Sequence, residues 1–179
     1  MKSFLISLLV VGSVIVVYSD GYSQTLGSPK PYGKPPLITN FYGPEQMKNG
    51  DALKFYIAAE DPDADMLGIA VTASVVYGGG ESVTRWIYLK PGNEKTFKGY
   101  LQWNTRSWSL RDFTKITLEV SVFDVAGNDS NEVVMPMTVS NFHVSYPPVP
   151  PPFGQEDIKR LGYIHMNLRD PLQDTPSLF

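Results

Sequence analysis

Oxygen-bearing side chains that could hold a hard cation gather in two short stretches of this 179-residue chain, EDPDAD at 60–65 and DVAGND at 124–129. The candidate ligands are Asp61, Asp63, Asp65, Asp124, Asn128 and Asp129. Calcium takes about six to eight oxygen ligands, and carboxylates gathered without a cation repel one another, so the pattern indicates a weak calcium site. Asp and Asn are also frequent in turns because their side chains bond to the nearby backbone, and solvated turns are therefore the alternative.

Large aromatic side chains form a second candidate site. Trp86, Tyr88 and Tyr100 stand in consecutive alternating segments. If they share an outer sheet face, they would form a ligand platform for a sugar ring or for a partner protein. The alternative is that one or two of them are buried and the rest shield the sheet, because large aromatics dominate ordinary cores as well.

Residues suited to catalysis are sparse. The chain has no cysteine, which excludes a thiol nucleophile, a disulfide framework and a thiolate metal site. His143 and His165 have no ligand-spaced neighbour, and no G-x-S-x-G nucleophile motif occurs. Asp61 and Asp124 could be paired for glycoside hydrolysis, which keeps a small hydrolase as a minor alternative. A formal net charge of −3 gives no electrostatic case for a nucleic-acid partner.

The elements that position these residues are expected to be strands, because segments of period-two alternation recur between turn signals such as Asn49-Gly50. The predicted strands are Leu37–Tyr42, Leu53–Ala59, Leu67–Val75, Val83–Leu89, Phe97–Trp103, Phe113–Phe123 and Val133–Val139. Seven short strands predict an all-β fold, an Ig-like seven-stranded antiparallel β-sandwich with Pro-rich tails, and an eight-stranded jelly roll is the alternative. In the Ig-like arrangement the loops after the second and sixth strands lie at the same end, so the two acidic stretches would meet.

Two of these strands carry more specific information. Ile116, Leu118, Val120 and Val122 alternate with polar residues, which predicts a central strand with one buried face. Pro136 stands in the last predicted strand and lacks the N–H that a ladder requires. That strand is therefore expected to be an edge, at least locally, which leaves assembly by strand addition open.

The N-terminal residues 1–23 are typical of a secretory signal peptide. Lys2 precedes an apolar run over Phe4–Val17, and small and polar residues follow, with cleavage expected before Gln24 or before Asp20. An uncleaved anchor is the alternative, but 14 apolar residues are short for a membrane span. We expect a secreted, periplasmic or cell-surface protein with no stable membrane span after cleavage.

The remaining boundaries follow from proline content. Residues 24–36 (QTLGSPKPYGKPP) are predicted to be a linker, residues 37–141 the sandwich, and residues 142–179 a second Pro-rich linker with a short C-terminal segment. Within that segment, 155–161 could form one or two helical turns and 163–169 alternates like a strand. The segment would either dock on another molecule or fold back on its own domain.

Two short motifs resemble a known group of proteins. Ala59–Leu67 (AEDPDADML) resembles the A-x-D-P-D-G-D-x-L stretch of bacterial cadherin-like and Ig-like surface domains, and Phe123–Asn131 (FDVAGNDSN) resembles their late x-D-x-A-G-N-x-S turn. The resemblance covers roughly residues 36–140 and implies an extracellular, non-catalytic module for adhesion or surface assembly. Some relatives bind calcium between consecutive domains. Ala64 stands where the family usually has Gly, the residue that permits a sharp turn between liganding carboxylates.

The sequence therefore predicts a non-catalytic Ig-like module that binds a protein partner or joins a surface assembly. No cofactor is expected to be required, and weak calcium binding would be an addition. A carbohydrate-binding module that uses the exposed aromatics is the alternative function, which would make a glycan the partner.

Overall fold

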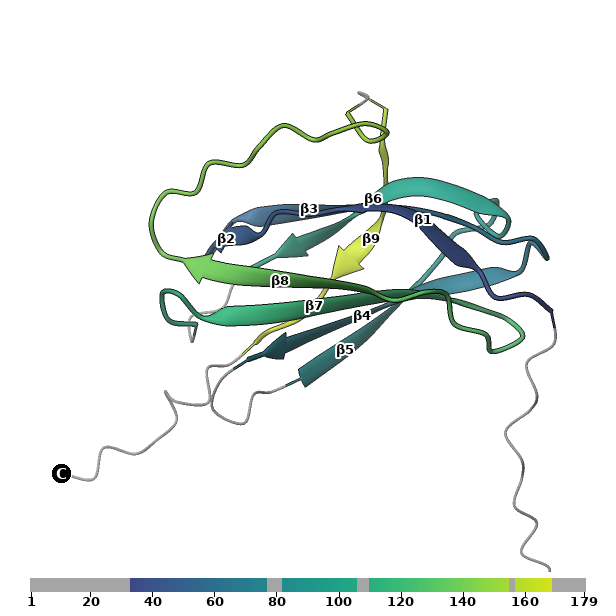
Figure 1. Cartoon of the computed structure of the whole chain (residues 1–179), viewed down its shortest axis with the longest axis horizontal. Coiled ribbons are helices and arrows are strands. Elements are labelled where there is room, and N and C mark those ends of the chain that lie inside the picture. Colours follow the sequence, from purple (N-terminus) through teal and green to yellow (C-terminus); the bar gives the residue numbers. More distant parts are fainter. Residues whose placement is uncertain (1–32, 77–81, 106–109, 155–156, 169–179) are drawn as a thin grey trace, which may run out of the picture. The chain divides into compact units, whose positions relative to one another are not determined.

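The computed structural model describes residues 33–76, 82–105, 110–154 and 157–168. These ranges are all-β and hold nine strands and no helix, so no candidate membrane-spanning helix occurs within them (Figure 1). In chain order the strands are β1 (Leu37–Tyr42), β2 (Gln46–Lys48), β3 (Ala52–Glu60), β4 (Met66–Val75), β5 (Ser82–Tyr88), β6 (Thr96–Asn104), β7 (Lys115–Asp124), β8 (Val133–Ser140) and β9 (Lys159–Ile164). The predicted signal peptide lies outside the described residues, as does the predicted linker up to residue 32.

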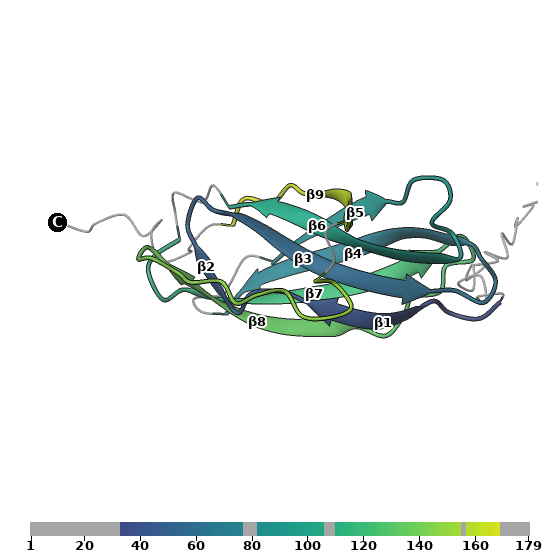
Figure 2. The same ribbon diagram turned by 90° about the horizontal axis from the view of Figure 1, so that it is seen from above.

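The strands form two sheets that face each other (Figures 1 and 2). One has the order β1-β3-β6-β9 and the other the order β2-β8-β7-β4-β5. The division of strands follows the immunoglobulin arrangement, with β9 beside β6 in the position of the fourth strand of that sheet. The predicted β-sandwich is thus confirmed. The prediction of seven antiparallel strands is wrong, because the described residues form nine strands. In addition, β2 pairs with β8 and β6 pairs with β9 in parallel.

The core lies between the sheets and is centred on β7. Its residues Ile116, Leu118, Val120 and Val122 are all buried, as the alternation predicts. The strand begins later than expected, however, because Phe113 has a positive φ of 63° and is largely exposed. A backbone in that conformation leaves the extended region, so the strand starts at Lys115.

The alternation of β4 breaks at its first residues. Leu67 is expected on the buried face with Ile69 and Val71, but it is exposed, and Met66 is buried instead. The cause is a register shift against β7 between Met66 and Gly68. A bulge of this kind turns one side chain to the opposite face without disturbing the pairing beyond it.

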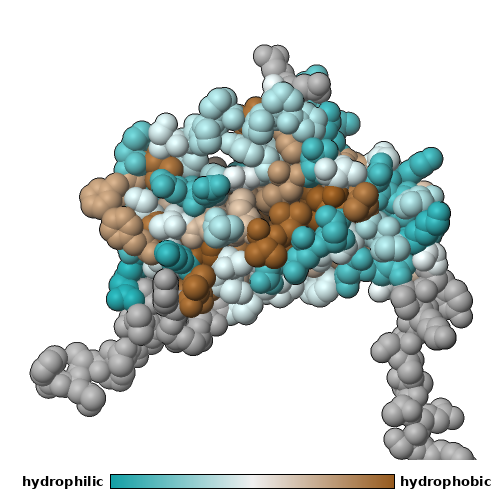
Figure 3. Space-filling model, viewed as in Figure 1, coloured by the Kyte–Doolittle hydropathy of each residue, from teal (hydrophilic) through white to brown (hydrophobic). Residues whose placement is uncertain are grey.

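The edge predicted at Pro136 is present, and its geometry explains the proline. The N–H of Thr138 points away from β7 and donates to Glu45 O (2.9 Å), so the nitrogen of Pro136, two residues earlier, points the same way. In the described part of the chain, β2 pairs only with residues 138–140 of β8. The proline therefore costs no ladder bond and removes a donor from an edge that no described strand covers. Figure 3 shows hydrophobic side chains gathered along β8 and β1 on this side. Pro136 therefore works against strand addition here.

The described part of the C-terminal region folds back on the sandwich. Ile164, Met166 and Leu168 are buried in the core, and Trp103 donates from Nε1 to Met166 O (3.3 Å). Residues 159–161, predicted to be helical, belong instead to strand β9. The segment thus folds back on its own domain, which is the alternative to docking on another molecule. Strand β9 joins the sandwich although it follows a Pro-rich stretch that is predicted to be a linker.

Candidate metal centre

Three carboxylates from distant parts of the chain meet at one end of the sandwich. Asp61 follows β3, Asp65 precedes β4 and Asp124 ends β7. One carboxylate oxygen from each lies within 4.8 Å of those of the other two. The pairing of β4 with β7 places Met66 opposite Asp124, which explains why the two acidic stretches converge.

Asp61 organises the first loop. It is only 2% exposed, and its Oδ1 and Oδ2 accept the backbone N–H groups of Asp63 (2.9 Å) and Asp65 (3.3 Å). Ala64 takes a φ of 60°, the conformation that glycine adopts most easily. The loop therefore closes around Asp61 even though alanine replaces the glycine of the related motif.

Asp124 is held by Asn128. Asp124 is 3% exposed, its Oδ1 accepts the backbone N–H of Asn128 (2.7 Å), and its Oδ2 accepts Asn128 Nδ2 (2.6 Å). Asn128 is itself buried, so the sequon-like Asn-Asp-Ser at this position is part of the turn and not an accessible acceptor. Asn128 thus acts on the cluster by positioning Asp124.

Asp65 is the carboxylate that has one oxygen without a partner among the described residues. Its Oδ1 is buried and accepts no hydrogen bond from the described residues. The pKa of Asp65 is raised, first by burial, then by its hydrogen bond with Asp61 and by the negative charges of Asp124, Asp61 and Asp63. A cation would supply the missing partner and relieve the repulsion, so these residues fit a hard divalent ion.

Two of the six predicted ligands lie outside this group. Asp63 is exposed, and its Oδ2 accepts the N–H of Lys34 (2.5 Å). Asp129 is exposed, and its backbone forms a bridge with Phe123. The group is therefore Asp61, Asp65 and Asp124, supported by Asn128. Asp65 also lines a hollow of about 380 Å³ with Leu67, Glu94 and Val125.

The same burial argues against the hydrolase alternative. A general acid or nucleophile must touch the glycosidic bond, but Asp61 and Asp124 are almost fully covered. Each already accepts two hydrogen bonds from its own loop. These carboxylates are placed to support a turn or an ion, and not to reach a sugar chain.

The aromatic candidates divide between the two sheets. Trp86 and Tyr88 lie on the outer face of β5, with 58% and 66% of their surface exposed. Tyr100 belongs to β6 in the other sheet, so a platform of all three is wrong. A side chain that the sequence analysis did not select, Phe123, packs edge-on against both Trp86 (5.1 Å between centroids) and Tyr88 (6.1 Å). The sequence signal for the outward position of Phe123 is that it directly follows Val122, which faces inward on the same strand.

Comparison with known proteins gives no family. No family model and no curated protein matches the chain. Among solved structures, an alkylpurine DNA glycosylase of Pseudomonas fluorescens is 14% identical (TM-score 0.42), and the match covers 60% of this chain and 31% of the glycosylase. A PKD domain of an M14-like peptidase from a Thermoplasmatales archaeon is 17% identical (TM-score 0.38; 60% and 98% covered). A CARDB domain from Pyrococcus furiosus, solved with di-metal ions, is 8% identical (TM-score 0.31; 58% and 86% covered). These similarities are too weak to carry a functional assignment.

Proposed function

We propose that the protein is a secreted or cell-surface, non-catalytic Ig-like module that binds a partner protein through the outer face of its five-stranded sheet. The observation that supports this proposal is the exposed pair Trp86 and Tyr88. Phe123 is only 9% exposed and braces both rings from β7. Large aromatics that are held rigidly in an exposed position are typical anchors of protein interfaces.

The part of the same face that continues along β4 and β5 from the aromatic pair is polar. Cross-strand hydroxyl pairs follow along β4 and β5, Thr72 with Thr84 (2.9 Å) and Ser74 with Ser82 (3.0 Å). These hydroxyls satisfy one another and need no partner. Binding interfaces have an apolar centre and a polar rim. The aromatic pair would be the centre here, and the hydroxyl-bearing residues would be part of the rim.

A carbohydrate partner is the second candidate. Trp86 and Tyr88 are two residues apart on one strand, so their side chains leave the same face at a spacing of about 7 Å. Exposed aromatic faces at this spacing offer apolar surface on which sugar rings can stack. This alternative uses the same two residues, and the two proposals differ only in the ligand.

One experiment tests both. Labelled protein is titrated onto the surface of the cells that produce it, with and without a panel of soluble glycans. We expect the double variant Trp86→Ala, Tyr88→Ala to lose at least tenfold in affinity, and Phe142→Ala, which truncates an exposed aromatic elsewhere, to bind like the wild type. Competition by a glycan favours the second candidate. Equal binding by the double variant contradicts both.

We also infer that calcium binds at Asp61, Asp65 and Asp124 as a structural ion. It would connect the loop after β3 to the end of β7, and so fix the end of the sandwich from which Phe123 braces the aromatic pair. The affinity expected for such an extracellular site is on the order of 10⁻⁴ to 10⁻³ M.

A further inference from the structure

A Pro-rich strap, residues 144–153, crosses the outer face of the four-stranded sheet and is fixed at two points. Tyr146 donates its hydroxyl to Asp51 Oδ2 (2.8 Å) and accepts the N–H of Lys48 (3.2 Å). Phe153 is buried against Tyr56, with 5.6 Å between ring centroids. The part of the strap between these anchors passes over the sheet.

The surface beneath the strap is a row of tyrosines from three adjacent strands. Tyr42 of β1, Tyr56 of β3 and Tyr100 of β6 follow one another at 6.2 and 5.9 Å. Tyr42 donates to Pro147 O at a long 3.5 Å. A tyrosine-lined face with hydroxyl donors is the surface that proline-rich chains use elsewhere, because their carbonyls have no partners within the chain. In this protein the face already holds a proline-rich segment of its own.

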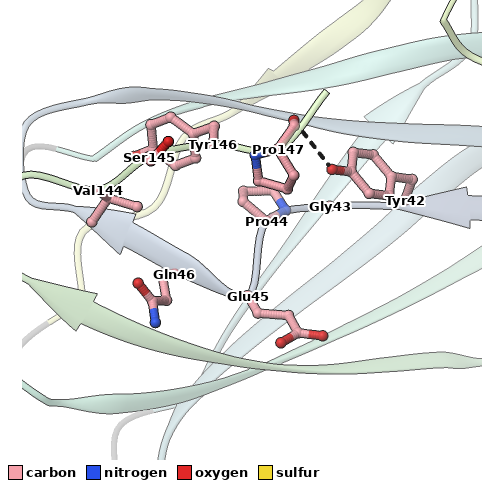
Figure 4. A pocket seen from close by; sticks show the side chains of 9 residues that line it. All are labelled: Tyr42, Gly43, Pro44, Glu45, Gln46, Val144, Ser145, Tyr146 and Pro147. Carbon is pink, nitrogen blue, oxygen red and sulfur yellow. Dashed lines mark hydrogen bonds between the residues drawn. The ribbon is translucent and has the colours of Figure 1, made fainter. Parts of the chain in front are cut away.

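A groove remains open beside the strap. One hollow of about 430 Å³ lies between Tyr42–Gln46 and Val144–Pro147 (Figure 4), and a second of about 180 Å³ continues it toward Tyr56. The four residues common to both are Tyr42, Pro44, Tyr146 and Pro147. The first hollow falls within the size range of ligand sites, and the four shared residues border both hollows.

Charged side chains of opposite sign line the two hollows and would orient a charged ligand. Glu45 lines the first hollow, and Lys54 lines the second, with its Nζ 4.7 Å from the centre of the Tyr100 ring. A cationic side chain would be attracted at the Glu45 end and repelled at the Lys54 end. The apolar part of a ligand would then lie over Tyr42 and Tyr56.

We propose that this groove binds an extended, proline-rich polypeptide that carries a lysine or arginine next to its prolines. The cation pairs with Glu45, the proline rings lie on Tyr42 and Tyr56, and the Gln46 amide donates to the ligand's carbonyls. Tyr42 and Tyr56 belong to the sheet that does not carry Trp86 and Tyr88, and so this site goes beyond the function proposed above.

The probe is a peptide with the sequence of residues 24–32, QTLGSPKPY, which places one lysine between two prolines. Labelled peptide is titrated with the purified protein and followed by fluorescence anisotropy. We expect saturable binding that weakens at least tenfold in Glu45→Lys and weakens as salt is added. The control Glu132→Lys reverses an exposed charge in the loop before β8 and should bind like the wild type.

A charge exchange separates a direct contact from a structural effect. A peptide in which the lysine is replaced by glutamate should bind the Glu45→Lys variant more tightly than it binds the wild type. Trp86→Ala should leave peptide binding unchanged, which keeps this result independent of the proposed function. Absence of saturable binding, or equal binding of the lysine peptide by wild type and Glu45→Lys, overturns the proposal.

Discussion

The backbone N–H of Asp65 donates to Oδ2 of Asp61 (3.3 Å), while the Oδ1 of Asp65 is buried and has no partner among the residues that the structure describes. Asp65 thus completes the hydrogen bonds of Asp61 and leaves one of its own carboxylate oxygens unsatisfied. Asp124 belongs to the same group, so three carboxylates gather at this end of the sandwich, and one of their oxygens has no described hydrogen-bond donor. A buried polar atom without a partner costs about 1–3 kcal/mol, which is what a bound cation would recover.

Calcium should stabilise the protein. With a dissociation constant of about 1 mM, about 10 mM calcium contributes ~1.4 kcal/mol. For a domain of this size we expect the Tm to rise by roughly 3–6 °C. Asp65→Asn should abolish the rise, because it removes one charged ligand, whereas Asp129→Asn should keep it. Differential scanning calorimetry in calcium and in EDTA measures both. An unchanged wild-type Tm in calcium would contradict the site.

Without calcium, stability should fall as the pH rises. The pKa of Asp65 is raised above its ordinary value of 3.8, so the folded state holds a proton that the unfolded chain releases. The stabilisation is complete below 3.8 and is lost as the pH rises through the raised pKa. Asp65→Asn, which resembles the protonated form, should flatten this part of the profile. Thermal melts in EDTA across the acidic range test it, and identical slopes for both proteins would exclude Asp65 as the source.

Gly68 should not tolerate a side chain. The ring of Phe123 lies where a Cβ at position 68 would stand, so Gly68→Ala forces Phe123 away from Trp86 and Tyr88. We expect a loss of about 1–3 kcal/mol by urea denaturation. In a Phe123→Ala background the same change should cost less, because the ring is absent and only the carbonyl oxygen of Ile87, 2.9 Å from the Cβ position, still has to shift. Additive losses in the double variant would show that the ring does not occupy this space.

The C-terminal segment should be part of the folding unit. Leu168 is buried against the core, so Leu168→Ala should cost about 2–5 kcal/mol. Tyr163→Ala, on the same segment but partly exposed, should cost less. Chemical denaturation of both variants compares them. A Leu168→Ala protein as stable as the wild type would mean that the segment does not contribute to the core.

The strands that could be predicted are those whose signal is local. The alternation of Ile116, Leu118, Val120 and Val122 identifies β7 and its buried face, since a strand presents every second residue to one side. Strand β2 is only three residues long and carries no such period. Strand β9 follows the Pro-rich strap, and its pairing with β6 depends on residues about 60 positions earlier.

The candidate metal site, too, could be predicted only in part. Residue type and turn chemistry select the acidic stretches, and the strand order that places their loops at one end can be inferred from the number of strands. Which carboxylates meet depends on loop closure: Asp61 turns its oxygens to its own loop, and Asp63 turns toward Lys34. These directions follow from backbone torsions such as the positive φ of Ala64, and residue types alone do not specify them.

By itself, the sequence determined that this chain builds strands, which of them is central, and which side chains could bind a cation. Only the tertiary structure decided that Tyr100 faces away from Trp86 and Tyr88, that Phe123 braces this pair, and that the C-terminal segment joins the core. The physical reason is that alternation is a property of neighbours along the chain. The sheet that a strand joins is set by pairing and packing between distant segments.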